Sequence, residues 1–299
     1  MILKYIKSIN LFLLFIACAN FLIRCKAPVS NKTFSYHKAG YWWKLISFQS
    51  DSFSYSPNSI AWISADFKTQ NDSVFYDSEH DLRDRFFIKI DSNIRSNCLK
   101  HLVSVVSAND SVCVLINTKS FFKQQFNSEI PFFCKNDSVI KVNFKIKQIL
   151  NEKEYGNIKS KIINNETKEI ESYFGNPSVF ENSRDSLGFY WVEKPIISDN
   201  SQGANYGDQI TISYEGAFLN GRIMDSSPPE FQINYGTPDQ LLKGINFVIS
   251  RLKKGQNSKI ILPSHLAFGE TGSSNGSIPP FTPMLYKISI IEIKKPASK

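Results

Sequence analysis

The chain has 299 residues, which is enough for two domains at about 100–200 residues each. Its net charge is +8, but the basic residues are scattered and no nucleic-acid-binding motif accompanies them, so nucleic-acid partners are not expected. The five cysteines form no CxxC motif and the four histidines are dispersed, which argues against a zinc site. We expect neither a metal nor a cofactor.

The first 25 residues resemble an export signal. A basic stretch is followed by the apolar run LFLLFIA, as in secretory signals. Ala17-Cys18 resembles a bacterial lipobox, in which the cysteine carries the lipid and becomes the mature N-terminus. The match departs from the pattern at Phe15, where leucine is usual, and Cys25 is a second candidate for lipid attachment.

Two other interpretations of the N-terminus stay open. Residues 6–23 are long enough, at a stretch, for an uncleaved membrane anchor, and an ordinary signal peptide is the third alternative. All three place the bulk of the chain outside the cytoplasm. We expect a membrane-anchored lipoprotein of the bacterial cell envelope, facing the periplasm and lipidated at Cys18.

The tetrapeptide NDSV occurs three times, at 71–74, 109–112 and 136–139. Asn, Asp and Ser form turns because their short side chains bond nearby backbone groups. Each copy leads into a run of β-forming residues, namely VFYDS, VCVLI and VIKVNFKI. The spacing is uneven, so we predict three hairpin turns in one antiparallel domain over residues 40–150 rather than a solenoid.

Three cysteines lie in this first domain: Cys98, Cys113 and Cys134. Cys113 alternates within an apolar strand, so a buried thiol is the expected state. A disulfide between two of the three stays an open alternative.

Residues 151–187 are charged and rich in asparagine, with few apolar residues outside the segment IESYF. We predict a helix near 166–174, followed by a linker.

The second domain spans 188–299. GFYWVEKP predicts its first strand, and Asn220-Gly221 is a strong signal for a hairpin. The segment QLLKGINFVISRL has apolar residues at helical spacing, and MLYKISIIEIKK alternates as a closing strand. One helix among antiparallel strands predicts an α+β domain.

Six segments of this domain carry a family resemblance: YEG at 214–216, MDSS at 224–227, FQINYG at 231–236, LLKG at 241–244, LAFGETG at 266–272 and SIPPFTPMLY at 277–286. In order and spacing they resemble the landmarks of the FK506-binding-protein (FKBP) family of peptidyl-prolyl cis-trans isomerases. The resemblance covers about residues 186–295. It implies a bent antiparallel β-sheet wrapped around a short α-helix, with a shallow apolar pocket between them.

The resemblance also implies which residues form the pocket: Tyr214, Asp225, Phe231, Leu241, Leu242, Ile245, Phe268, Ile278 and Tyr286. The backbone N–H of Leu242 would bind a substrate carbonyl, and Asp225 would bond Tyr214.

Three positions depart from the family pattern. Met224 stands where phenylalanine is usual, and Ile245 replaces the tryptophan of the pocket floor. Phe268 lacks the hydroxyl of the family's flap tyrosine, which should weaken carbonyl capture by one hydrogen bond, about 0.5–1.5 kcal/mol.

The first domain aligns with the second when Asp77 of YDSE is matched to Asp225 of MDSS. The pocket segments are then changed: YEG becomes SADF at 64–67, GETG becomes KQQF at 123–126, and IPP becomes IPF. We predict two FKBP-like domains of which the first is degenerate and non-catalytic, with Asp77 as a capping or turn carboxylate.

The predicted function is that of a lipid-anchored prolyl isomerase, which would help proline-containing exported polypeptides to fold. The alternative is an FKBP-fold binding or chaperone module of an envelope complex, of the kind associated with gliding bacteria, with little or no turnover.

Overall fold

The computed structural model describes residues 33–48, 58–90, 98–196, 203–273 and 277–295. The predicted signal and lipobox region, with Cys18 and Cys25, lies outside these residues. Among the described residues, no helix has the length and apolar character needed to cross a membrane.

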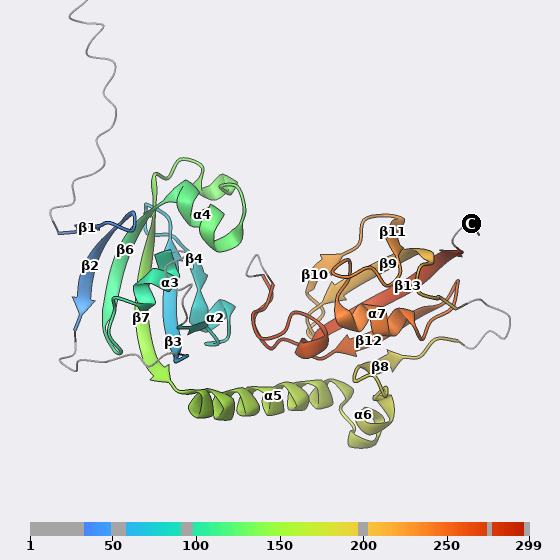
Figure 1. Cartoon of the computed structure of the whole chain (residues 1–299). Coiled ribbons are helices and arrows are strands. Elements are labelled where there is room, and N and C mark those ends of the chain that lie inside the picture. Colours follow the sequence, from blue (N-terminus) through green and yellow to red (C-terminus); the bar gives the residue numbers. More distant parts are fainter. Residues whose placement is uncertain (1–32, 49–57, 91–97, 197–202, 274–276, 296–299) are drawn as a thin grey trace, which may run out of the picture. The chain divides into compact units, whose positions relative to one another are not determined.

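The first domain is built on a seven-stranded antiparallel sheet with the order β1-β2-β6-β7-β3-β4, in which β5 also pairs with β3 (Figure 1). Its strands are β1 Ser35–His37, β2 Tyr41–Ser47, β3 Ile60–Lys68, β4 Val74–Asp77, β5 Phe87–Lys89, β6 Ser111–Asn117 and β7 Val139–Leu150. Its helical segments are α2 Ser78–Asp81, α3 Cys98–Val103, α4 Thr118–Phe126 and the short 3-10 turn η1 Phe132–Cys134. Helix α3 packs on the sheet through Leu99, Leu102 and Val103, which are all buried.

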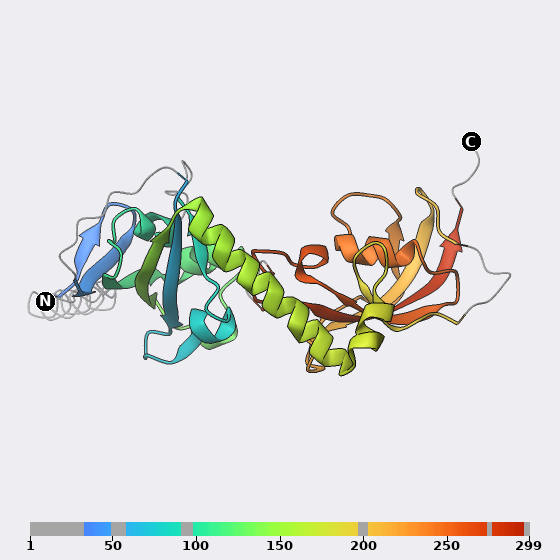
Figure 2. The ribbon, with the colours of Figure 1, turned by 90° about the horizontal axis from the view of Figure 1, so that it is seen from below.

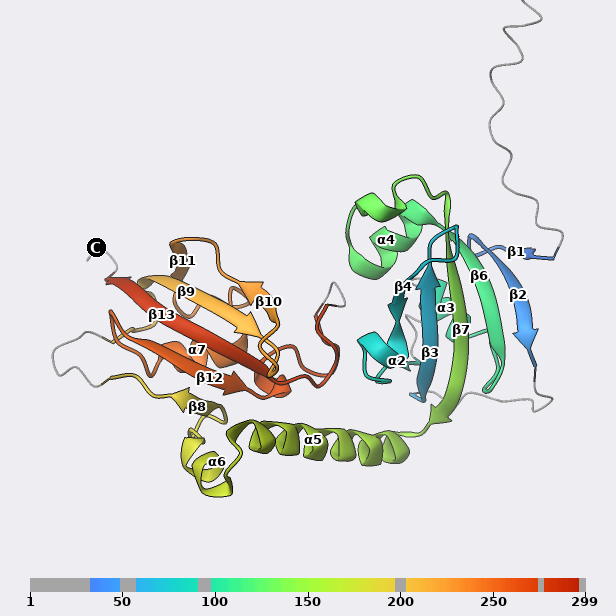
Figure 3. The same cartoon turned by 180° about the vertical axis from the view of Figure 1, so that it is seen from behind.

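The second domain has a six-stranded sheet with the order β10-β9-β13-β12-β8, and β11 also pairs with β9 (Figure 3). Its strands are β8 Tyr190–Glu193, β9 Gln209–Ala217, β10 Ile223–Ser226, β11 Phe231–Asn234, β12 Asn257–Leu262 and β13 Met284–Lys294. Helix α7 Lys243–Ile249 and the 3-10 turn η2 Ser264–Leu266 complete it. Ile245, Val248 and Ile249 of α7 are buried against the sheet.

The two sheets share one topology. The order β2-β6-β7-β3-β4 in the first sheet corresponds to the order β8-β12-β13-β9-β10 in the second. One further strand pairs outside each order: β5 pairs with β3, and β11 pairs with β9. In each domain a short helix follows this further strand along the chain: α3 follows β5, and α7 follows β11. The predicted fold class, two bent antiparallel sheets that each enclose a short helix, is therefore confirmed.

Buried and more exposed residues alternate along the long strands, as expected for strands with one face in the core. Every second residue of β3 is buried, and β13 begins with buried residues and then alternates. A register shift interrupts the β3–β7 ladder and another interrupts the β9–β13 ladder. Such bulges increase local twist, which curves each sheet around its helix.

The three NDSV segments all precede strands, as predicted, but only one of them closes a hairpin. Asn71-Asp72 joins β3 to β4, and Asp72 takes the left-handed φ of +67° that the turn requires. The second copy begins in the connection between α3 and β6 and ends in the first two residues of β6, and the third ends a connection that contains α4 and η1. The prediction of three hairpins was therefore wrong for two copies, because in this topology helical segments precede β6 and β7.

Helix α4 was not predicted. The KQQF segment, which aligned with the GETG loop, forms its last turn. The side chain of Asn117 caps its first turn by accepting a hydrogen bond from the amide of Ser120, and Asn127 ends it in the left-handed conformation. Phe121 of this helix lies edge-on to Phe67, with 5.0 Å between ring centroids.

Cys98, Cys113 and Cys134 are free and buried. The predicted buried thiol at Cys113 is confirmed, and no disulfide joins the three.

Helix α5 Glu152–Phe174 is one continuous helix, much longer than the predicted 166–174 (Figure 2). It begins at a capping box, in which Asn151 accepts a hydrogen bond from the amide of Glu154 and the Glu154 carboxylate accepts one from the amide of Asn151. It ends at Gly175, whose φ of +65° favours glycine. Helix α6 Pro177–Ser183 follows directly.

The C-terminal half of α5 packs on the second domain. Ile170 is 1% exposed and shares a cluster with Phe180 of α6 and with Tyr190, Ile261 and Leu285 of the sheet. The apolar residues of IESYF thus dock on the outer face of the sheet that carries the pocket described below.

Candidate active site

A pocket of about 410 Å³ opens between β9, β10 and the start of α7. It is lined by Tyr214, Asp225, Asp239, Gln240, Leu241, Leu242, Ile245 and Phe268. Six of the nine residues that sequence reasoning selected therefore line one cavity, although they come from four separate segments of the chain. Asp239 and Gln240, which were not predicted, form its rim immediately before the LLKG motif.

Asp225, one of the two acidic residues that line the pocket, is held by Tyr286. The Tyr286 hydroxyl donates a hydrogen bond of 2.9 Å to the Asp225 carboxylate. Tyr286 is fully buried, and burial raises the pKa of its hydroxyl, with a further contribution from the negative charge of Asp225. The hydroxyl therefore stays protonated and remains a donor at neutral pH.

This pairing corrects the expectation that Asp225 bonds Tyr214. Tyr214 lines the cavity, with its ring centroid 6.0 Å from that of Tyr286. The sequence order of the two tyrosines could not reveal which hydroxyl points at the carboxylate, because the choice depends on the register between β9 and β13.

That register places Gly216 directly opposite Tyr286. A Cβ atom on Gly216 would lie 2.5 Å from Cε1 of the tyrosine ring. The glycine of the YEG motif therefore gives the Tyr286 ring the space to lie across β9 and reach Asp225.

Phe231 and Ile278 support the pocket from behind. Phe231 packs edge-on to Tyr214, with 6.3 Å between ring centroids, and belongs to the same apolar cluster. Ile278 is 2% exposed and lies in the core. These two residues, with Tyr286, complete the predicted set without lining the cavity themselves.

The start of α7 forms the floor. Leu242 is the N-cap residue of the helix and lines the pocket, and Ile245 is 1% exposed at its base. No side chain caps this helix start. A Cβ on Gly244 would meet the Leu266 carbonyl oxygen at 2.8 Å, so this glycine permits close packing of α7 against η2.

Phe268 is carried by the loop between β12 and β13. The Ser264 carbonyl accepts hydrogen bonds from the amides of Ala267 and Gly269, at 2.9 and 2.8 Å, on either side of Phe268. The Gly269 carbonyl in turn accepts one from the amide of Phe281 at 2.8 Å. Backbone hydrogen bonds therefore hold the residues flanking Phe268.

The corresponding positions of the first domain are different. Asp77 caps α2 by accepting hydrogen bonds from the amides of Glu79 and His80, which confirms its predicted capping role. Asn143 stands opposite Asp66 in the β7–β3 register, where the second domain has Tyr286 opposite Gly216. Where the second domain has the Tyr286 ring, the first domain thus has Asn143, which offers no aromatic ring to reach Asp77.

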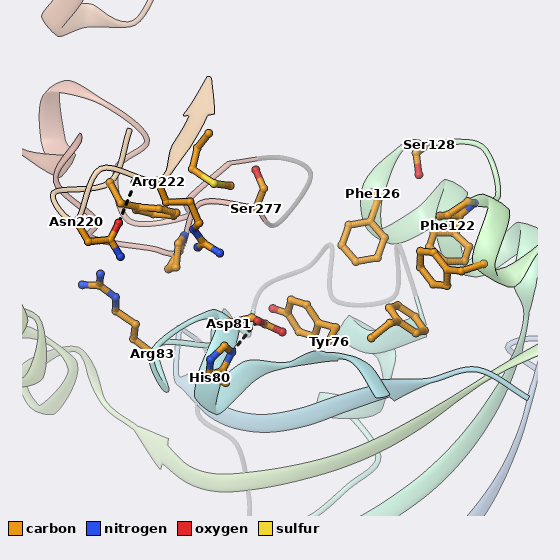
Figure 4. Close-up of a pocket in the computed structure, with 16 residues that line it drawn as sticks. Tyr76, His80, Asp81, Arg83, Phe122, Phe126, Ser128, Asn220, Arg222 and Ser277 are labelled. Atoms are coloured by element: carbon orange, nitrogen blue, oxygen red, sulfur yellow. Dashed lines mark hydrogen bonds and ion pairs between the residues drawn. The ribbon is translucent and has the colours of Figure 1, made fainter. Parts of the chain in front are cut away.

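Aromatic side chains gather beside β4 of the first domain. Figure 4 shows Tyr76, Phe122 and Phe126, whose rings are part of a cluster with centroid distances of 6.5 Å for Tyr76–Phe126 and 5.9 Å for Phe122–Phe126. Two of these residues come from α4, the helix that replaces the loop bearing Phe268.

The second-domain pocket offers apolar walls, the carboxylates of Asp225 and Asp239, and a helix start that no side chain caps. Such a cavity suits a short peptide segment with an apolar ring and a carbonyl group. Rotation about a peptide bond needs only this kind of environment, since it makes and breaks no covalent bond.

Comparison with known proteins identifies relatives of the second domain. The family described as FKBP-type peptidyl-prolyl cis-trans isomerase matches residues 200–291. FK506-binding protein 1 of Saccharomyces cerevisiae is 32% identical over 105 residues, which cover 34% of this chain and 90% of that protein.

Two bacterial relatives are longer than the matched region. Peptidyl-prolyl cis-trans isomerase Mip of Coxiella burnetii is 31% identical over 102 residues, 34% of this chain and 44% of that protein. A probable FKBP-type peptidyl-prolyl cis-trans isomerase of Haemophilus influenzae is 29% identical over 97 residues, 31% of this chain and 38% of that protein. The chain thus spans less than half the length of either.

Proposed function

The chain belongs to the FKBP-type peptidyl-prolyl cis-trans isomerase family, and we propose that its second domain catalyses rotation about the peptide bond that precedes proline. The observation that carries this proposal is the single cavity formed by Tyr214, Leu242, Ile245 and Phe268, with Asp225 held at its edge by Tyr286.

The barrier to this rotation is about 18–20 kcal/mol, and the unaided reaction takes tens to hundreds of seconds. Rotation breaks the amide resonance, so the twisted state has less charge separation than the planar state. Water solvates the planar amide better, whereas a dry pocket favours the twisted state. Ile245 and Phe268 would surround the proline ring, and the Leu242 amide would hold a carbonyl.

Asp225 would stand near the twisting carbonyl. Its carboxylate is half-buried and its orientation is fixed by the Tyr286 hydroxyl. A fixed charge beside the peptide can favour one orientation of the amide dipole without reorganising during the reaction.

The test is a prolyl-isomerase assay on the full chain purified in detergent, with Asp225→Ala as the variant. Loss of a hydrogen bond to a charged group costs about 1.5–3 kcal/mol, so we expect kcat/KM to fall about 10-fold or more. Asp77→Ala is the matched control, because it removes the aspartate at the equivalent position of the first domain and should leave kcat/KM unchanged. Equal activity of wild type and Asp225→Ala would refute the assigned role of Asp225.

A second candidate function is binding without turnover. Two departures from the family pattern favour it, namely Ile245 on the floor in place of tryptophan and Phe268 without a hydroxyl. A folded wild-type chain that binds proline-containing peptides but does not accelerate their isomerisation would establish this candidate.

We further propose that the protein is a lipoprotein of the bacterial envelope, where it assists the folding of exported proline-containing polypeptides. Support comes from the basic and apolar segments that precede Cys18. Metabolic labelling with a fatty acid should mark the wild type and not Cys18→Ala, because the thiol of Cys18 would carry the lipid. Cys25→Ala is the control and should keep its label; labelling that disappears only in Cys25→Ala would move the attachment site.

A further inference from the structure

A buried carboxylate on α5 is tied to the loop that carries Phe268. Glu166 is 4% exposed, and its two oxygens accept hydrogen bonds from the backbone amide and the hydroxyl of Ser264, the latter at 2.8 Å. A charged group is rarely buried without such partners, because the loss of water is costly. Burial raises the pKa of Glu166, and the Ser264 hydrogen bonds and the nearby Arg85 act against that rise.

Ser264 is also the residue that holds both neighbours of Phe268. Its carbonyl accepts the hydrogen bonds from Ala267 and Gly269 described above. Its other two polar groups, the amide and the hydroxyl, are the ones bound by Glu166. The Glu166 carboxylate thus fixes the orientation of Ser264, and the Ser264 carbonyl in turn holds the two residues that flank Phe268.

Helix α5 is packed against the second sheet close to this contact. Ile170 lies one turn further along the helix and is buried against Ile261 and Leu285 of the sheet. The side chains at positions 166 and 170 project from the same face of the helix. The docking that buries Ile170 therefore also places Glu166 at Ser264.

We propose that Glu166 is a positioning residue for the isomerase pocket, acting through Ser264 to hold the Phe268 loop against the cavity. This inference rests on the proposed function for its effect on turnover. It extends the functional unit beyond residues 200–291 to a helix in the segment 151–187, which precedes the predicted second domain.

The test compares Glu166→Ala and Glu166→Gln with the matched control Glu152→Gln in the full chain. Glu152 is exposed on the first turn of the same helix. Glu166→Ala should lower kcat/KM about 10-fold, because the loop loses both hydrogen bonds to the carboxylate. Glu166→Gln keeps an oxygen acceptor for the Ser264 amide and should recover part of the loss, whereas Glu152→Gln should match the wild type.

Amide hydrogen exchange provides a readout that does not depend on turnover. In Glu166→Ala, peptides covering 263–270 should exchange about 10-fold faster or more, while peptides of β12 keep the wild-type rate, because only the loop loses its support. Uniform acceleration over both peptides would indicate a general structural role and overturn the inference, as would unchanged exchange in the loop. An inactive wild type with a selective effect on loop exchange would count against the proposed function while supporting the contact.

Discussion

Replacing Gly216 with alanine is expected to lower both the stability of the second domain and its isomerase activity. The new Cβ would lie 2.5 Å from Cε1 and 2.8 Å from Cζ of Tyr286, closer than packed atoms come. Tyr286 is fully buried, so the ring cannot move without displacing its neighbours. Overpacking of this kind costs about 1–3 kcal/mol.

The loss of activity in Gly216→Ala should follow from the same displacement. When the Tyr286 ring moves, its hydroxyl no longer reaches Asp225, and the carboxylate becomes free to turn away from the cavity. The measurement is urea-dependent hydrogen exchange of β13 peptides, which reports on the second sheet alone, together with kcat/KM.

Gly156→Ala is the matched control for Gly216→Ala. Gly156 lies within α5, and a Cβ there would meet no atom within 4 Å. Alanine has a higher helix propensity than glycine, so Gly156→Ala should raise the free energy of unfolding of α5 by about 0.5–1 kcal/mol. A Gly216→Ala protein as stable and as active as the wild type would show that the Tyr286 ring does not need the space above Gly216.

Sequence reasoning identified the pocket because its residues lie in short segments whose order is itself a signal. YEG, MDSS and LLKG each combine a turn or strand pattern with a residue type that the cavity needs, and the structure places Tyr214, Asp225 and Leu242 on one cavity wall or rim. The partner of Asp225 could not be predicted in this way. It depends on which tyrosine is opposite a glycine across the sheet, and this register is a long-range property.

The helices α4 and α5 show a second limit. Residues 151–165 contain charged and polar residues with few apolar ones, so their periodicity is weak, yet a capping box and a docked C-terminal half stabilise a helix over the whole segment. In α4 the segment KQQF at 123–126 aligned with a loop of the second domain, although Phe121, Phe122 and Phe126 together have a spacing that suits a helical face. Tertiary packing decided both outcomes, and local propensity alone could not.

Replacing Ile170 with alanine is expected to destabilise the second domain by about 2–5 kcal/mol, the usual cost of deleting a buried isoleucine side chain. Ile170 is 1% exposed and contacts the cluster that joins α5 and α6 to Ile261 and Leu285. Because this docking also places Glu166 at Ser264, the variant should accelerate exchange in peptides 263–270 as well as in β12. The measurement is urea-dependent hydrogen exchange of both peptides.

Ile163→Ala is the matched control for Ile170→Ala. Ile163 lies on the same helix and is 42% exposed, so its truncation should change the stability by no more than about 0.5 kcal/mol. If both variants matched the wild type, α5 would be a linker that merely rests on the sheet, and the support of the Phe268 loop would have to come from the loop's own backbone hydrogen bonds. A large effect of Ile170→Ala alone would make α5 a structural part of the isomerase domain, since a helix that contributes several kcal/mol to the sheet cannot detach from it during the catalytic cycle.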